Sequence, residues 1–142
     1  MNKLFAFAFI IITAFSFVSC KKNAEVDKAS LVARTWYVVD GRFGTEKPAP
    51  GQLEGIMLSM TSDGKYQVAN PNMVPVSPTR SSSNTGTWAL SANGNIIIFD
   101  AKSAQENSVN IVSLNGNRME IEWREEKPGK VATTYALSLQ AR

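Results

Sequence analysis

Strict alternation of apolar and charged residues in one short stretch most constrains how this chain can fold. Between positions 118 and 124 the apolar set is Met119, Ile121 and Trp123, and the charged set is Arg118, Glu120, Glu122 and Arg124. A period of two places the two sets on opposite faces of a β-strand. The preceding Asn115-Gly116 is typical of a two-residue hairpin turn, because both residues tolerate positive φ. The stretch from Asn107 to Glu126 therefore predicts a β-hairpin with one buried face and one solvent-exposed face.

Similar short patterns predict six further strands along the chain. They cover residues 35–43, 56–61, 65–69, 85–90, 95–100 and 131–140. All six prolines lie in the connections between these segments, as expected because proline cannot donate a hydrogen bond within a sheet. In the run Ile96-Ile97-Ile98-Phe99 both faces are apolar, so alternation does not assign an inner face there.

The connections between the strands alternate in length. Tight turns at 62–64, 91–94 and 115–116 alternate with longer loops at 44–55, 70–84, 101–106 and 127–130. If each strand returns beside the last, the tight turns gather at one end and the loops at the other. A meander with one apolar face avoids exposed edges by closing on itself. We therefore predict an all-β, eight-stranded antiparallel up-and-down barrel, with a short helix over 25–34 closing the tight-turn end.

The first 19 residues are predicted to be a leader that is not part of the fold. Lys3 supplies a positive start, and an apolar run of 15 residues follows from Leu4 to Val18. This run is shorter than the roughly 20 residues that span a bilayer. The pattern is that of a cleaved secretory signal peptide. The alternative is a permanent transmembrane anchor.

The single cysteine, Cys20, stands where the leader ends. The stretch Phe17-Val18-Ser19-Cys20 resembles the lipobox of bacterial lipoproteins, with Phe17 where leucine is usual. The resemblance implies that cleavage makes Cys20 the new N-terminus and that its sulfur carries a lipid. The alternative is a lone cysteine that lies at the boundary by chance. The predicted organisation is a signal peptide at 1–19, a lipidated cysteine, tether and start of the helix at 20–30, and the barrel at 31–142.

The amino-acid composition excludes several classes of catalytic and metal site. The chain contains no histidine, and its one cysteine is Cys20. Histidine-based acid–base catalysis, serine–histidine triads and Cys- or His-ligated metals are therefore excluded. The acidic pairs Glu120/Glu122 and Glu125/Glu126 are interpreted as solvated surface. We predict no catalytic residues, no metal and no cofactor, and the scattered charges do not favour nucleic acid as a partner.

A family resemblance extends over residues 31–139. A short helix and eight strands, with Arg34-Thr35-Trp36 opening the first strand, resemble the bacterial lipocalin-like lipoproteins of Bacteroidetes-type envelopes. The family's usual opening is Gly-X-Trp, and Arg34 stands at the glycine position. The segments 62–66 and 86–90 and the turn around Asn115 add to the resemblance. It implies a lipocalin-like barrel that binds a small apolar ligand.

The candidate ligand-binding residues are the apolar ones expected to line the barrel: Trp36, Leu58, Met60, Tyr66, Val68, Trp88, Leu90, Met119, Ile121, Trp123, Tyr135 and Leu137. The alternative for each of them is plain core packing.

A second hypothesis is an envelope structural or protein-interaction module with a filled barrel. Its candidate is the loop from Asn70 to Asn84, which contains three prolines and four serines. Long loops without secondary structure are usually functional or disordered. The expected location is the cell envelope, lipid-anchored in the outer membrane, with periplasmic and surface exposure both open. The expected contacts are the membrane, a small hydrophobic ligand and an envelope protein.

Overall fold

The computed structural model describes residues 27–74 and 77–142, so the predicted signal peptide and Cys20 lie outside the described residues. Within these residues there is one helix, α1, which spans Lys28–Val32. The strands are β1 (Thr35–Phe43), β2 (Met57–Met60), β3 (Lys65–Ala69), β4 (Thr85–Leu90), β5 (Ile96–Phe99), β6 (Asn107–Asn115), β7 (Arg118–Glu125) and β8 (Thr133–Ala141).

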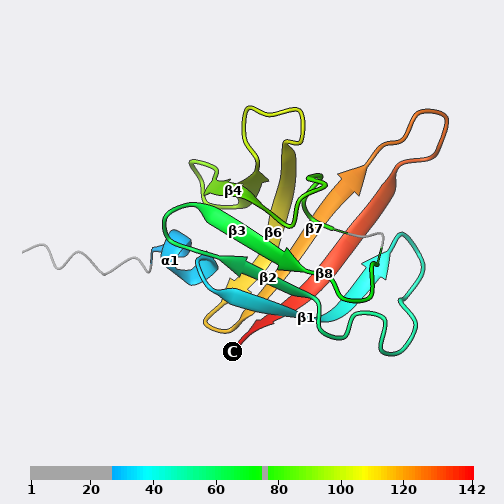
Figure 1. Ribbon diagram of the computed structural model, residues 1–142, viewed down its shortest axis with the longest axis horizontal. Coiled ribbons are helices and arrows are strands. Elements are labelled where there is room, and N and C mark those ends of the chain that lie inside the picture. The colour runs from blue at the N-terminus through cyan, green and yellow to red at the C-terminus, as the bar shows by residue number, and fades with distance from the viewer. Residues whose placement is uncertain (1–26, 75–76) are drawn as a thin grey trace, which may run out of the picture.

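The strands form a closed barrel in sequence order, and every neighbouring pair is antiparallel (Figure 1). β8 closes the barrel by pairing with β1 over most of its length. The prediction of an all-β, eight-stranded up-and-down barrel is therefore confirmed. Because each strand runs opposite to the last, the three tight turns lie at one end, here called the tight-turn end. The four longer loops lie at the other, here called the long-loop end.

Helix α1 closes the tight-turn end, but it is shorter than the predicted span of 25–34. Asp27 caps it, since its Oδ1 accepts a hydrogen bond from the Ala29 backbone N–H at 3.1 Å. Val32 is fully buried, and its carbonyl accepts a 2.9 Å hydrogen bond from the Trp36 indole. Lys28 Nζ donates to Asn95 Oδ1 at 2.8 Å, which connects the helix to the turn between β4 and β5. These contacts fix the helix over the end of the barrel.

The turn between β6 and β7 differs from the prediction. Asn115 pairs with Arg118, so the two turn residues are Gly116 and Asn117 rather than Asn115 and Gly116. None of these turn residues has positive φ. The reason is local hydrogen bonding, because Asn115 Oδ1 accepts from the Arg118 backbone N–H at 3.1 Å and so closes the turn from its first position.

Three strands are shorter or shifted at their ends relative to the sequence pattern. β2 covers 57–60 instead of 56–61, and β5 covers 96–99 instead of 95–100. β8 begins at Thr133 instead of Val131, because a turn closed by the hydrogen bond from Lys130 N–H to the Lys127 carbonyl precedes it. Val131 is consequently 93% exposed.

Each of two strands contains an irregularity in its pairing. The register of β1 against β8 shifts between Val38 and Asp40, and that of β6 against β7 shifts between Ile111 and Ser113. An extra residue of this kind is left out of the ladder and changes the direction of its side chain. Val112 is accordingly 61% exposed on the barrel wall.

Candidate functional site

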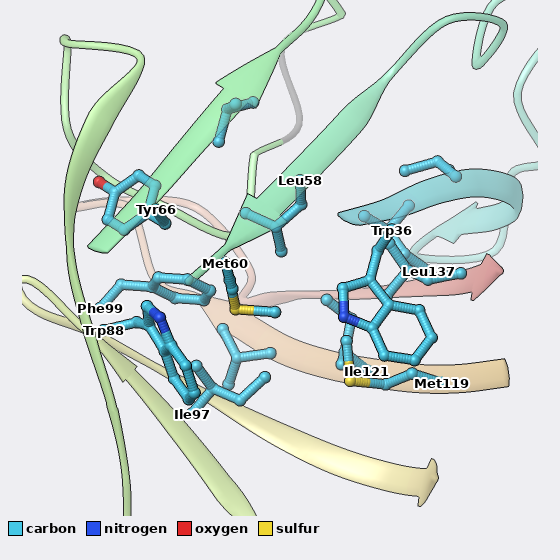
Figure 2. Packing of buried hydrophobic residues seen from close by; sticks show 14 of the residues in the cluster. Trp36, Leu58, Met60, Tyr66, Trp88, Ile97, Phe99, Met119, Ile121 and Leu137 are labelled. Carbon is cyan, nitrogen blue, oxygen red and sulfur yellow. The ribbon is translucent and has the colours of Figure 1, made fainter. Parts of the chain in front are cut away.

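The predicted interior residues do lie in the interior. Ten of the twelve are buried, and Figure 2 shows how several of them pack, among them Trp36, Met60 and Trp88. The other two, Leu90 and Tyr135, are partly buried and pack against the same cluster. The sequence pattern did not assign the inner face of β5, which presents Ile97 and Phe99. The core also contains Val109 and Leu139, which were not among the candidates. Alternation in β6 places Asn107 and Val109 on one face and could have identified Val109.

Two of the three tryptophans use their indole N–H to join elements. Trp36 Nε1 donates to the Val32 carbonyl, and Trp88 Nε1 donates to the Thr61 carbonyl at 3.0 Å. Trp123 stacks on Tyr135 with ring centroids 5.4 Å apart. Its indole nitrogen is buried and lacks a hydrogen-bond partner within the described part of the chain. Trp36 and Trp88 therefore act as structural donors at the tight-turn end.

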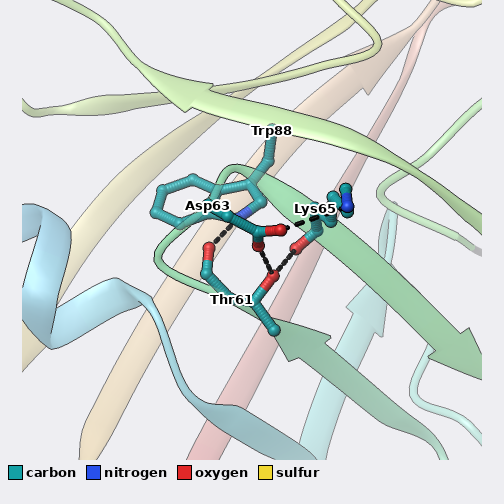
Figure 3. A network of polar contacts seen from close by, with 4 residues as sticks. All are labelled: Thr61, Asp63, Lys65 and Trp88. Atoms are coloured by element: carbon teal, nitrogen blue, oxygen red, sulfur yellow. Dashed lines mark hydrogen bonds and ion pairs between the residues drawn. The ribbon is translucent and has the colours of Figure 1, made fainter.

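The turn between β2 and β3 is built around Thr61 (Figure 3). Its hydroxyl donates to the Asp63 carboxylate and lies 3.1 Å from the Lys65 carbonyl oxygen, while its own carbonyl accepts from Trp88. Asp63 also pairs with Lys65 Nζ at 3.2 Å. The hydrogen bond from Thr61 and the neighbouring Lys65 lower the pKa of Asp63. This arrangement stabilises an exposed turn, and the polar groups of the turn are paired mainly with one another.

Tyr66 connects β3 to the end of β5. Its hydroxyl donates to Asp100 Oδ2 at 2.6 Å, and the Thr87 backbone N–H donates to Asp100 Oδ1 at 3.0 Å. Burial, followed by the hydrogen bond to Asp100, raises the pKa of Tyr66 to about 12. Gly86 lies opposite Tyr66, and a Cβ there would be 2.6 Å from the Tyr66 hydroxyl oxygen. Tyr66 is therefore a protonated donor at neutral pH and has a structural partner.

The cavity that the described residues enclose at one end of the barrel is small. At the long-loop end an apolar cavity leaves only about 10 Å³ for the centre of a water-sized sphere. A volume of about 10–15 Å³ measured in this way accommodates roughly one water molecule. The cavity is lined from the strands by Val38, Phe43, Leu58, Val68, Leu137 and Leu139, and from the loops by Leu53, Ile56 and Pro78 among others. Of the twelve ligand-binding candidates, Leu58, Val68 and Leu137 line it.

Hydrogen bonds join the loop that follows β3 to its neighbours. The Asn72 side-chain amide donates to the carbonyls of Gly51, Gln52 and Glu54, at 3.3, 3.1 and 2.8 Å. Asn107 Nδ2, which is buried, donates to the Pro78 carbonyl at 2.7 Å. The described parts of the 70–84 loop are therefore built into the long-loop end. Sequence reasoning singled out this loop but not the asparagines that position it.

One apolar side chain of this loop projects into solvent. Met73 is 88% exposed and has a φ of 49°, a left-handed conformation that a long side chain rarely adopts. Its neighbours fix it there. Asn70 Oδ1 accepts from the Val74 backbone N–H at 3.1 Å, and Asn70 Nδ2 donates to the Val74 carbonyl at 2.8 Å. Strained backbone of this kind clusters at binding sites.

The acidic pairs noted in the sequence are distributed over the surface. Glu125 lies 3.9 Å from Lys127 Nζ, and Glu126 lies 3.6 Å from Arg124 Nε. Surface ion pairs contribute about 0–1 kcal/mol each. Within residues 27–74 and 77–142, no group of three or more His, Cys, Asp or Glu side chains is placed to hold a metal ion.

Comparison with models of known protein families and with curated proteins yields no match for this chain. In the portion that the structure describes, the one helix is too short to cross a membrane.

Proposed function

We propose that the protein is a lipid-anchored, non-catalytic envelope protein of the lipocalin-like lipoprotein type. In this proposal its barrel is a filled scaffold, and its long-loop end binds a partner protein. The observation that carries this is the cavity at the barrel mouth, which has room for about one water molecule. A barrel filled in this way positions loops rather than enclosing a ligand.

The long-loop end has the properties of a preorganised binding surface. The Asn72 amide joins two loops, and Asn70 fixes the backbone around Met73. Preorganisation lowers the entropy that is lost when a loop binds its partner. A partner with an apolar pocket could accept the Met73 side chain, which is exposed in the free protein.

The membrane attachment rests on the leader. A signal-like segment followed by Val18-Ser19-Cys20 supports lipidation of Cys20, and the barrel's tight-turn end lies close to it along the chain. The outer membrane is the proposed location. Mass spectrometry of the protein from its native envelope tests this part separately, since acylation adds the mass of two or three fatty chains to a peptide that begins at Cys20.

Site-specific photocrosslinking in intact cells tests the binding surface. A photoreactive residue at Met73 is expected to capture a specific partner. The matched control is the same residue at Val112, which is exposed on the barrel wall rather than at the loops. Capture of the same set of proteins from both positions would contradict the proposal.

A second candidate function is the binding of a small apolar ligand at the barrel mouth. The observation that favours it is the apolar lining of the mouth cavity, which the loops carrying Leu53 and Pro78 cover. A ligand larger than a water molecule requires these loops to move outward. Saturable binding of a fluorescent fatty acid, lost in a Leu137→Trp variant that fills the mouth, is the expected result for this function.

A further inference from the structure

The two ends of the barrel differ in charge. The tight-turn end, residues 27–35, 61–65, 91–95, 115–118 and 140–142, carries five basic and two acidic side chains. The long-loop end, described residues of 42–56, 70–84, 100–106 and 124–132, carries seven basic and six acidic side chains. The side chains of the tight-turn end therefore have a net charge of +3, whereas those of the long-loop end are close to neutral.

Three arginines of the tight-turn end gather beside the turn between β6 and β7. Arg34 Nη1 donates to a backbone carbonyl of this turn. Arg118, Gln140 and Tyr37 are consecutive partners across β7, β8 and β1, so they lie in one row. The Arg142 guanidinium lies over the Tyr37 ring, 4.6 Å from its centroid. The three positive charges are therefore close together in space although they are far apart in the sequence.

The two acidic side chains of the tight-turn end interact with residues other than these arginines. Asp27 accepts hydrogen bonds from the first turn of α1, and Asp63 pairs with Lys65. Among the described residues, none of the three ion pairs includes Arg34, Arg118 or Arg142. Their charge is consequently left for an external anion.

The chain length between the proposed anchor and the barrel limits where this end can lie. Seven residue steps separate Cys20 from Asp27. A fully extended chain covers at most about 3.6 Å per residue, so Asp27 lies within about 25 Å of the anchor. Lys21 and Lys22 add two positive charges to the same segment. A lipid on Cys20 would keep the basic end near the headgroups.

We propose that the tight-turn end is a docking surface for anionic phospholipid headgroups, with Arg34, Arg118 and Arg142 as its phosphate-binding side chains. The planar guanidinium group matches phosphate in two parallel hydrogen bonds, which a lysine ammonium does not. The orientation follows from the proposed function, because the surface faces the membrane from which the anchor emerges. The long-loop end then points away from the bilayer, where a partner can reach it.

Vesicle binding of the leader-free chain, residues 21–142, tests this surface without the lipid. The barrel is complete in this chain, because each strand has two neighbours and the buried cluster is drawn from described residues. Binding is measured by cosedimentation with phosphatidylcholine vesicles that contain either no phosphatidylglycerol or roughly one third of it. The expected result is binding to the anionic vesicles only. Binding should weaken as salt rises from about 0.05 to 0.5 M, because the Debye length shortens.

Replacing Arg34, Arg118 and Arg142 by glutamine is expected to weaken binding on the order of 100-fold, roughly fivefold per arginine. The matched control replaces Arg124, Lys127 and Lys130 by glutamine, which removes the same charge from the opposite end. A double variant, Arg118→Gln with Arg142→Gln, retains the Arg34 hydrogen bond to the turn. If the triple variant unfolds, the loss of vesicle binding is measured on this double variant instead.

Equal losses in the two triple variants would overturn the proposal, since net charge alone would then explain binding. Absence of binding to the anionic vesicles would also overturn it. Failure of lipidation in the native envelope, with vesicle binding retained, would remove the anchor but leave this surface. Lipidation of Cys20 without vesicle binding would leave the anchor and overturn the headgroup-binding surface. The two proposals can therefore fail separately.

Discussion

Gly86→Ala is the substitution that tests the packing of the barrel most sharply. An alanine Cβ at this position would be 2.1 Å from Asp100 Oδ1 and 2.6 Å from both Cε1 and the hydroxyl oxygen of Tyr66. Cβ atoms are not found this close to non-bonded heavy atoms, so both the Tyr66 ring and the Asp100 carboxylate must move. The 2.6 Å hydrogen bond between them is then lost or distorted.

The expected destabilisation combines three effects. Overpacking of a core position costs about 1–3 kcal/mol. Loss of a hydrogen bond to a charged group costs about 1.5–3 kcal/mol. Alanine is itself favoured over glycine within a strand by about 0.5–1 kcal/mol, which offsets part of this cost. The free energy of unfolding should therefore fall by about 1.5–5.5 kcal/mol.

Urea denaturation of the leader-free chain measures this change. The matched control is Gly116→Ala, because a Cβ at Gly116 meets no atom within 4 Å and its φ is not positive. The control should be neutral or more stable than the parent by up to about 1 kcal/mol. Equal stability of the Gly86 and Gly116 variants would refute the packing of Tyr66 across Gly86.

Three further predictions concern individual side chains. The phenol of Tyr66 should titrate near pH 12 by ultraviolet absorbance, and Tyr66→Phe should abolish that transition. Since its pKa is raised by folding, its contribution to stability should be complete below about pH 10 and be lost between about pH 10 and 12. Trp36→Phe should lower the free energy of unfolding by about 0.5–1.5 kcal/mol more than Trp123→Phe in urea denaturation, because only Trp36 loses an indole hydrogen bond, while the Val32 carbonyl keeps its bond from the Arg34 N–H. Equal losses would contradict this. Asn72→Ala should increase hydrogen exchange in the loops around 51–54 and 70–74, because the three hydrogen bonds of the Asn72 amide are lost, and it should leave exchange in β6 and β7 unchanged. Unchanged exchange in the loops would show that these hydrogen bonds do not restrain them.

The barrel could be predicted because its signals are local. Alternation defines the inner face of β7, and turn residues define the ends of β3 and β4, whose predicted bounds match the structure. Burial of both Trp36 and Trp123 followed from the same period of two. In β5 the local signal was absent, because apolar residues occupy both faces and only the closed sheet determines that Ile97 and Phe99 point inward.

The surface features could not be predicted in the same way, since they depend on contacts between distant residues. Nothing near Asn72 in the sequence indicates that its amide reaches the carbonyls of residues 51–54. The arginine group at the tight-turn end joins residues 34, 118 and 142, which only the closure of β8 on β1 brings together. The degree of filling of the barrel depends on side-chain volumes around its whole circumference, which alternation does not report.

Whether the barrel interior is occupied is the most direct test of a filled scaffold that acts through its surface. The measurement is native mass spectrometry of residues 21–142, exported to the envelope by a cleavable secretory signal so that the chain meets the lipids present there. The account predicts a single species at the mass of the polypeptide. A bound molecule of a few hundred daltons that dissociates on denaturation would contradict it and would establish that the mouth between Leu53 and Pro78 opens to admit a ligand.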